Sequence, residues 1–177
     1  MPRSTRTTLR TAEAHDARHI HALITANLVE GHLLPRTLDE LTVHAWRFVV
    51  ATRGRKIVGC GELAPLSPQV AEVRSLAVDK SARQMGVGTM LVEELRVRAR
   101  REGYDKLCAF THTPGYFSSM GFSIVPHLWL PEKIATDCVK CPRFRQCGQY
   151  AMVVPVGAFE VTESVRHVPA ASVARYA

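Results

Sequence analysis

The chain has 177 residues and a formal net charge of +7 at pH 7, with 46% hydrophobic and 22% charged residues. This length suits one domain with its own core, and the composition is that of an ordinary globular protein. No apolar run approaches the roughly 20 residues that cross a bilayer, and the N-terminus lacks the apolar segment of a secretory signal. We therefore expect a cytoplasmic protein without a membrane partner, whose positive charge would suit an anionic ligand.

The first third of the sequence predicts a strand, two helices and a strand hairpin. Apolar residues recur at the spacing of one helix face at Ile20, Leu23, Ile24 and Leu28. Gly31 is expected to end that helix, and Arg53-Gly54 is a hairpin signal between two apolar runs. The expected elements are a strand at Thr8–Ala12, helices at His15–Val29 and Leu38–His44, and strands at Trp46–Thr52 and Lys56–Leu63.

The remainder of the sequence predicts strands that alternate with helices. The longest helix is amphipathic and is expected to stop at Gly103. Its inward residues are Val87, Leu91, Leu95 and Ala99, and its expected outward residues are Glu93, Glu94, Arg98 and Arg101. The expected elements are a strand at Glu72–Val78, a helix at Gly86–Arg101, a strand at Leu107–Thr111, a short helix at Tyr116–Met120 and a strand at Tyr150–Val156.

This alternation indicates one mixed α/β domain. We assign the domain to residues 1–157, of which residues 1–7 are expected to be a flexible N-terminus. Residues 158–177 lack a clear periodicity, so we leave the structure of this tail open.

A loop between a strand and a helix is the strongest functional signal. The strand ends at Val78, and the sequence Arg83-x-x-Gly86-x-Gly88 follows just as a helix starts. Backbone N–H groups at a helix N-terminus attract negative charge, and glycines let a phosphate approach the backbone closely. The spacing matches neither the Gly-Lys-Ser/Thr phosphate loop nor the dinucleotide fingerprint. The loop therefore predicts a pyrophosphate-binding site of another kind.

The order of these features resembles the GNAT acetyltransferases. The matching parts are the strand VRSLAV, the R-x-x-G-x-G loop, a long helix, an apolar strand and then YFSSMGF, within roughly Leu9 to Val156. The resemblance implies an α/β (mixed α+β) fold with a central, mostly antiparallel twisted sheet, a splayed strand pair and flanking helices. It also implies acetyl-CoA as co-substrate, with its pyrophosphate on the glycine loop and its pantetheine arm between the splayed strands.

A finer resemblance is to the acetyltransferase domain of the N-acetylglutamate synthases. The segments LVEGHLLPRTLDEL, GELAPLSPQVAEVRSLAVDK and THTPGYFSSMGFSIV, followed by LPEK, carry this resemblance. It implies transfer of an acetyl group to the α-amine of L-glutamate, the opening reaction of arginine biosynthesis. The sequence departs from that family because it has no room for an amino-acid-kinase-like domain. The basic residue expected before the last strand also has no clean match, since Arg143 and Arg145 are merely nearby.

The resemblance assigns two catalytic roles. Glu72 is the expected general base, because amine attack on a thioester requires a neutral amine and a free α-amino group has a pKa near 8. Thr113 is the expected acid for the leaving thiolate. Many relatives use a tyrosine at the position of Phe117 instead, and the neighbouring Tyr116 is expected to point elsewhere. Simple structural roles stay open as well: an ion pair between Glu72 and Arg74, which project from one strand face, and helix capping by Thr113.

The expected binding residues follow from the same resemblance. Arg36 and Arg74 are the expected clamps for the acceptor carboxylates, because guanidinium groups pair bidentately with carboxylates, and Phe117 is placed beside the acceptor. Backbone amides of the splayed strand are expected to hold the developing oxyanion. The expected cofactor-binding residues are Leu76, Ala77, Val78, Arg83, Gln84, Met85, Gly86, Val87, Gly88 and Thr89.

A cysteine cluster and the alternative functions complete the hypotheses. Cys138, Cys141 and Cys147 have spacing that suits part of a zinc site, with His127 or Asp137 as a further ligand, but three free thiols or a redox pair fit equally. The alternatives to glutamate acetylation are a GNAT enzyme for another amino acid or small amine, and a non-catalytic module that binds coenzyme A. Scattered basic residues argue against a nucleic-acid partner, and a homodimer is left open.

Overall fold

The structure is a computed structural model, and it describes residues 6–30 and 33–157. These residues build one seven-stranded sheet in the order β1-β2-β3-β4-β5-β7-β6, in which only β4 and β5 run parallel. The strands are β1 Thr7–Thr11, β2 Phe48–Arg53, β3 Lys56–Pro65, β4 Val70–Val78, β5 Lys106–Thr111, β6 Ser123–Val125 and β7 Tyr150–Pro155. The expectation of a mixed, mostly antiparallel sheet is confirmed.

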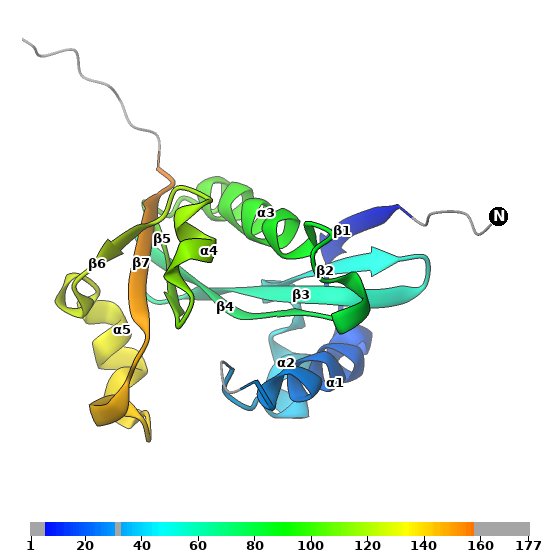
Figure 1. Cartoon of the computed structure of the whole chain (residues 1–177), viewed down its shortest axis with the longest axis horizontal. Coiled ribbons are helices and arrows are strands. Elements are labelled where there is room, and N and C mark those ends of the chain that lie inside the picture. The colour runs from blue at the N-terminus through cyan, green and yellow to red at the C-terminus, as the bar shows by residue number, and fades with distance from the viewer. Residues whose placement is uncertain (1–5, 31–32, 158–177) are drawn as a thin grey trace, which may run out of the picture.

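Helices cover both faces of this sheet. The α-helices are α1 Ala17–Leu28, α2 Leu38–Val43, α3 Val87–Arg101, α4 Pro114–Ser118 and α5 Pro131–Thr136. Short 3-10 helices are η1 Ala14–Asp16, η2 Ala45–Arg47, η3 Lys80–Ala82, η4 His127–Trp129, η5 Cys138–Lys140 and η6 Phe144–Gln146. Helix α3 lies on one face of the sheet, whereas α1, α2 and α5 lie on the other (Figure 1).

Helix α3 packs closely on the sheet because two glycines of β3 lie beneath it. A Cβ atom at Gly59 or Gly61 would come within 3.0 Å of a leucine side chain of α3. The expected inward face of α3 is buried, and the helix ends before Gly103, which adopts a left-handed φ of +85°. The placement of Arg98 on the outside was wrong. Arg98 is buried, because its guanidinium donates to the Trp46 carbonyl at 2.7 Å and to Glu102 at 2.6 Å.

A bulge divides β4 into two parts. The parallel pairing with β5 runs from Val70 to Val73, whereas the antiparallel pairing with β3 continues to Val78. Between them, Ser75 has a left-handed φ of +52°, and the register with β3 shifts by one residue. An extra residue reverses the strand face on which each later side chain lies. Val73 and Leu76 therefore both face α3, and β4 separates from β5 beyond the bulge.

Most predicted elements are confirmed within a few residues, and the differences are local. Thr7, expected in a flexible N-terminus, lies in β1, and Trp46, expected in a strand, lies in η2. The elements β6 and α5 were missed because each is short. The expected helix end at Gly31 and the tail 158–177 lie outside the described residues. In the part of the chain that the structure describes, every helix is too short or too polar to cross a membrane.

Candidate active site

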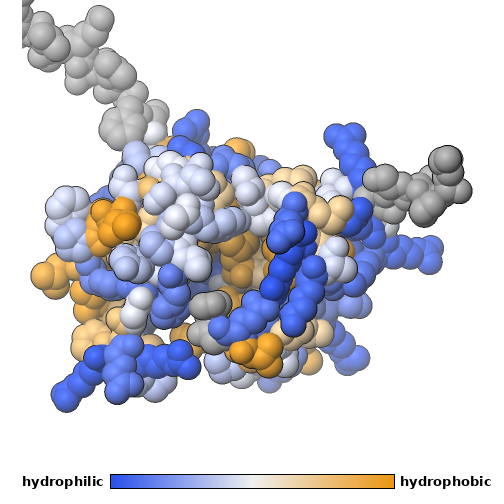
Figure 2. All heavy atoms as spheres, viewed as in Figure 1, coloured by the Kyte–Doolittle hydropathy of each residue, from blue (hydrophilic) through white to orange (hydrophobic). Residues whose placement is uncertain are grey.

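A cavity of about 410 Å³ opens between the glycine loop, β4, the end of α1 and α4. Figure 2 shows a recess beside α4 with apolar atoms at its floor and hydrophilic side chains along its rim. Eight of the ten expected cofactor-binding residues line it. They are Leu76, Val78, Arg83, Gln84, Gly86, Val87, Gly88 and Thr89, joined by Asn27, Glu30, Leu33, Ala82 and Tyr116.

The glycine loop is shaped by two residues in the left-handed region. Gln84 has a φ of +61° and Gly86 a φ of +75°, and Gly86 is the N-cap of α3. A Cβ atom on Gly86 would meet no atom within 4 Å. The backbone at the start of α3 is thus uncovered at this point, as a phosphate-binding helix N-terminus requires.

Arg83 fixes the loop to the rest of the domain. Its guanidinium donates to Asn27 at 2.6 Å, to Glu30 at 2.8 Å and to the Val78 carbonyl at 3.3 Å. The arginine of the motif therefore joins the loop to α1 and β4. Arg83 also lines the cavity, and its contact with the cofactor stays a prediction.

Two expected cofactor residues do not line the cavity. Ala77 is buried on the opposite face of β4, because the bulge places it in the core beneath α1. Met85 is exposed, and its sulfur accepts a hydrogen bond from Arg53 at 3.3 Å. The side chains of Ala77 and Met85 are therefore withdrawn from the expected cavity lining.

Tyr116 points elsewhere than its neighbour Phe117, as expected, but it is Tyr116 that lines the cavity while Phe117 lies in the core. Its hydroxyl is buried and has no hydrogen-bond partner of normal geometry among the described residues. A Cβ atom on Gly88 would lie 2.5 Å from this hydroxyl, so a larger residue there would displace the Tyr116 side chain. Burial raises the pKa of Tyr116 above its usual value, against a smaller lowering effect of Thr89. The hydroxyl therefore stays protonated near neutral pH and can donate.

Phe117, placed beside the acceptor by resemblance, is buried in the main core. Its ring packs edge-on against Phe122 and against Tyr116, with ring centroids 5.2 Å apart in both pairs. It lines no part of the cavity. The side chain supports Tyr116, and an acceptor contact of Phe117 is withdrawn.

Ion pairs hold Glu72 on the face of β4 opposite α3. One oxygen of Glu72 accepts from Arg74 Nη2 at 2.6 Å and from Arg74 Nε at 3.1 Å. The Lys133 ammonium, from α5, lies 2.8 Å from each carboxylate oxygen. Glu72 is buried, so these two cations replace its lost hydration. The ion pair that sequence left open between Glu72 and Arg74 is present.

Asp137 completes this group. It follows α5 and accepts hydrogen bonds from Lys133 at 2.9 Å and from Arg74 Nη2. Burial alone would raise the pKa of Asp137, but Lys133 and Arg74 outweigh it and hold this pKa below the ordinary value. Arg74 Nη1 makes no hydrogen bond to any residue in the described ranges, and the Arg74 side chain is partly exposed. One arm of this guanidinium is thus open to a ligand.

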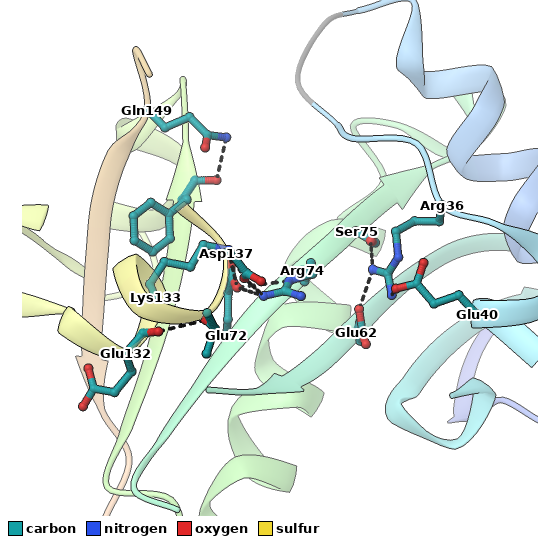
Figure 3. Close-up of polar contacts among 12 residues, drawn as sticks. Arg36, Glu40, Glu62, Glu72, Arg74, Ser75, Glu132, Lys133, Asp137 and Gln149 are labelled. Atoms are coloured by element: carbon teal, nitrogen blue, oxygen red, sulfur yellow. Dashed lines mark hydrogen bonds and ion pairs between the residues drawn. The ribbon is translucent and has the colours of Figure 1, made fainter. Parts of the chain in front are cut away.

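A second cluster surrounds Arg36 on the same side of β4 (Figure 3). Arg36 Nη1 donates to Glu62 at 2.7 Å and to the Ser75 hydroxyl at 2.9 Å, and Nη2 lies 2.9 Å from Glu40. Burial disfavours the charge on Arg36, but the two carboxylates outweigh it and raise the pKa of Arg36. Glu62 is opposite Arg74 in the β3–β4 register, so the two clusters adjoin.

We call these seven charged side chains the acceptor face: Arg36, Glu40, Glu62, Glu72, Arg74, Lys133 and Asp137 (Figure 3). Of these residues, Arg36, Glu72 and Arg74 were expected from the sequence. It gave no role to Glu62, although a glutamate within the apolar run IVGCGELAP is a detectable signal. Lys133 was visible only as part of the LPEK segment, and its distance from Glu72 in sequence hid their contact.

Thr113 lies at the N-cap of α4, but its side chain forms no capping bond. Its hydroxyl lies 3.2 Å from that of Thr111, and it is exposed outside the cavity lining. The capping role that sequence left open is therefore absent, and the hydroxyl is accessible.

The cysteine cluster supports no metal site. Cys138, Cys141 and Cys147 are all free thiols. No group of three or more histidine, cysteine or acidic side chains among residues 6–30 and 33–157 is arranged to hold a metal ion. The expected zinc site is therefore not shown.

Known proteins match this chain along most of its length. The model of the acetyltransferase (GNAT) family matches residues 14–122, more than half of the chain. An uncharacterized N-acetyltransferase of Chlorobaculum tepidum is 33% identical over 147 residues, which cover 83% of this chain and 95% of that protein. An amino-acid acetyltransferase of Neisseria meningitidis is 31% identical over 131 residues, which cover 73% of this chain and 30% of that protein.

A solved structure extends the likeness. N-acetylglutamate synthase from Neisseria gonorrhoeae, complexed with coenzyme A and N-acetyl-glutamate, matches with a TM-score of 0.77 and 26% identity. The match covers 87% of this chain and 36% of that one, so this chain spans about a third of the length of these two Neisseria relatives. Together with the splayed sheet and the cavity at the glycine loop, the family match shows that the chain belongs to the GNAT family of N-acetyltransferases.

Proposed function

We propose that this enzyme transfers the acetyl group of acetyl-CoA to the α-amine of L-glutamate. The observation that carries the proposal is the acceptor face, where Arg36, Arg74 and Lys133 lie together on the face of β4 opposite α3. Arginine pairs well with carboxylates, and glutamate has two of them. The amino-acid acetyltransferase and N-acetylglutamate synthase relatives support the same acceptor.

The cavity at the glycine loop fits coenzyme A in three respects. Gly86 leaves the start of α3 uncovered, Gly88 makes room for Tyr116, and the buried Tyr116 hydroxyl has no hydrogen-bond partner of normal geometry within residues 6–30 and 33–157. We infer that the pyrophosphate binds the amides of Gln84–Thr89. When bound, acetyl-CoA supplies the acetyl group as a thioester. The backbone near Leu76 and Val78, beyond the end of the β5 pairing, is the proposed donor to the oxyanion.

Glu72 is the proposed acceptor of the amine proton, directly or through water. Its hydrogen bonds come from Arg74 and Lys133, which hold the carboxylate in place on β4.

Two hydroxyl groups are candidates to donate the proton that the leaving thiolate takes up. Thr113 was expected by resemblance, and its hydroxyl has no capping bond. Tyr116 is favoured by its place in the cavity and by its buried hydroxyl. We propose Thr113 as the acid and Tyr116 as a donor that holds the cofactor, since Tyr116 lies beside Gly88 at the start of α3.

A second candidate function is acetylation of another amino acid. The acceptor face contains four carboxylates and three cations, which also suits the ammonium group of any amino acid. A thiol-release assay with acetyl-CoA and a panel of amino acids separates the two. Glutamate should give the highest kcat/KM, and faster turnover of glutamine or lysine would reject the glutamate assignment.

The first prediction concerns the cofactor loop. Gly86→Ala places a methyl group over the start of α3 at a left-handed position, and Gly103→Ala places one at the other end of the same helix. Each should lower stability by about 1–2 kcal/mol because of its positive φ. Only Gly86→Ala should weaken coenzyme A binding measured by calorimetry. Equal coenzyme affinities in the two folded variants would contradict the proposed phosphate site.

A second prediction tests the tyrosine in the cavity. Tyr116→Phe removes one hydrogen-bond donor and should weaken coenzyme A binding roughly two- to tenfold, the usual worth of a neutral hydrogen bond. Tyr104→Phe is the matched control, because Tyr104 packs on the same core without lining the cavity. If the two variants bind coenzyme A alike, Tyr116 has no contact with the cofactor.

The third prediction concerns the acceptor clamp. Arg36→Ala would leave Glu62 buried without a cation. Arg36→Lys is the better variant, because it keeps the positive charge but lacks the forked guanidinium group. It should raise the KM for glutamate about tenfold or more and leave the KM for acetyl-CoA unchanged. Arg96→Lys on α3 is the control. A rise in the acetyl-CoA KM alone would remove Arg36 from the acceptor site.

The fourth prediction separates a base from a positioning residue. Glu72→Gln should lower kcat by about 10²–10⁴ at neutral pH if Glu72 takes the proton. The deficit should shrink towards pH 9, because more α-amine is then already neutral. Glu62→Gln, also buried beside an arginine, is the control and should raise the glutamate KM with a pH profile of unchanged shape. The same unchanged profile in Glu72→Gln would make Glu72 a positioning residue for Arg74.

A further inference from the structure

Each arginine of the acceptor face is held by two carboxylates of unlike burial. The two sets are Arg36 with Glu62 and Glu40, and Arg74 with Glu72 and Asp137. The inner carboxylates, Glu62 and Glu72, have side chains that are 1% and 5% exposed and come from strands. The outer carboxylates, Glu40 and Asp137, are 42% and 36% exposed and come from α2 and from the end of α5 (Figure 3).

Charge balance limits how a dicarboxylate can enter. The acceptor face already has four carboxylates for three cations, so two more would meet repulsion at short range in a poorly solvated place. An inner carboxylate that was displaced from its arginine would be buried without a charged partner, which is strongly unfavourable. An outer carboxylate can turn to water, and an exposed ion pair contributes little. The two outer carboxylates, Glu40 and Asp137, are therefore the ones that an acceptor can displace.

We propose that the two carboxylates of the acceptor take the places of Glu40 on Arg36 and of Asp137 on Arg74 and Lys133. The inference rests on the proposed function, because it requires a dicarboxylate acceptor. Glu40 and Asp137 act as stand-ins that neutralise the cations while no acceptor is bound. The inner carboxylates stay in place and keep the three cations positioned.

Lys133 becomes a specificity-determining residue on this account. Its ammonium contacts Glu72 and Asp137 and lies 5.2 Å from the centre of the Phe110 ring. Displacement of Asp137 frees donors on both Lys133 and Arg74, so two cations receive one acceptor carboxylate. An amino acid with a single carboxylate displaces only one outer carboxylate and leaves the other on its cation. The acceptor face thus distinguishes the two classes of acceptor, because a dicarboxylate replaces both outer carboxylates and a monocarboxylate replaces only one.

The test uses glutarate, which has the two carboxylates of glutamate without the amine and cannot be acetylated. Its binding is measured by calorimetry with saturating coenzyme A, for the unmodified enzyme and for Glu40→Gln and Asp137→Asn. Removal of the charge of Glu40 or of Asp137 should tighten glutarate binding about two- to fivefold, which corresponds to the free energy of an exposed ion pair. The KM for glutamate should fall by a similar factor, with no change in the KM for acetyl-CoA.

Glu93→Gln is the matched control, because Glu93 is a partly exposed carboxylate that pairs with Arg96 on α3. It should leave glutarate binding unchanged. Unchanged or weaker glutarate binding in a folded Glu40→Gln or Asp137→Asn variant overturns the exchange. The two variants lie on separate helices, so loss of folding in one leaves the other decisive. If glutamate is not acetylated but the glutarate result holds, the proposed acceptor fails while the exchange stands.

Discussion

The extra residue at Ser75 in β4 is the constraint on which the whole site depends. Up to Val73, β4 is paired on both sides, and beyond the bulge it is paired with β3 alone. The bulge also reverses the strand faces, so Leu76 and Val78 line the cofactor cavity while Arg74 remains on the acceptor face. The cavity and the acceptor face therefore lie on opposite faces of one strand.

Electrostatic compensation then determines what the acceptor face can do. Arg36, Arg74 and Lys133 can be withdrawn from water only because carboxylates accompany them. Buried pairs of this kind fix geometry more than they add stability, and here they hold three cations in one arrangement. Arg83 has the corresponding task on the cofactor side, where it ties the glycine loop to α1. Positioning by ion pairs is thus common to the cavity and the acceptor face.

Local patterns in the sequence predicted the elements and the cofactor loop. Helix α3 was readable from its apolar repeat, and Gly86 and Gly88 marked the loop without any tertiary information. Only part of the acceptor face could be predicted, because its contacts join residues that are far apart in sequence, such as Glu72 and Lys133. The place of Tyr116 in the cavity was missed because only the tertiary packing shows that Phe117, and not Tyr116, turns into the core. Arg98 was misjudged because a carbonyl of η2 satisfies it in the interior.

The central claim is that the acceptor face binds the two carboxylates of the acceptor beside the end of the coenzyme. A crystal structure of the enzyme with coenzyme A and N-acetyl-L-glutamate tests it most directly. The account predicts one carboxylate on Arg36, the other on Arg74 and Lys133, and the acetamide group at the separation of β4 and β5. It also predicts that Glu40 and Asp137 have turned away from their arginines. Carboxylates bound elsewhere, with all ion pairs of the acceptor face intact, would contradict it.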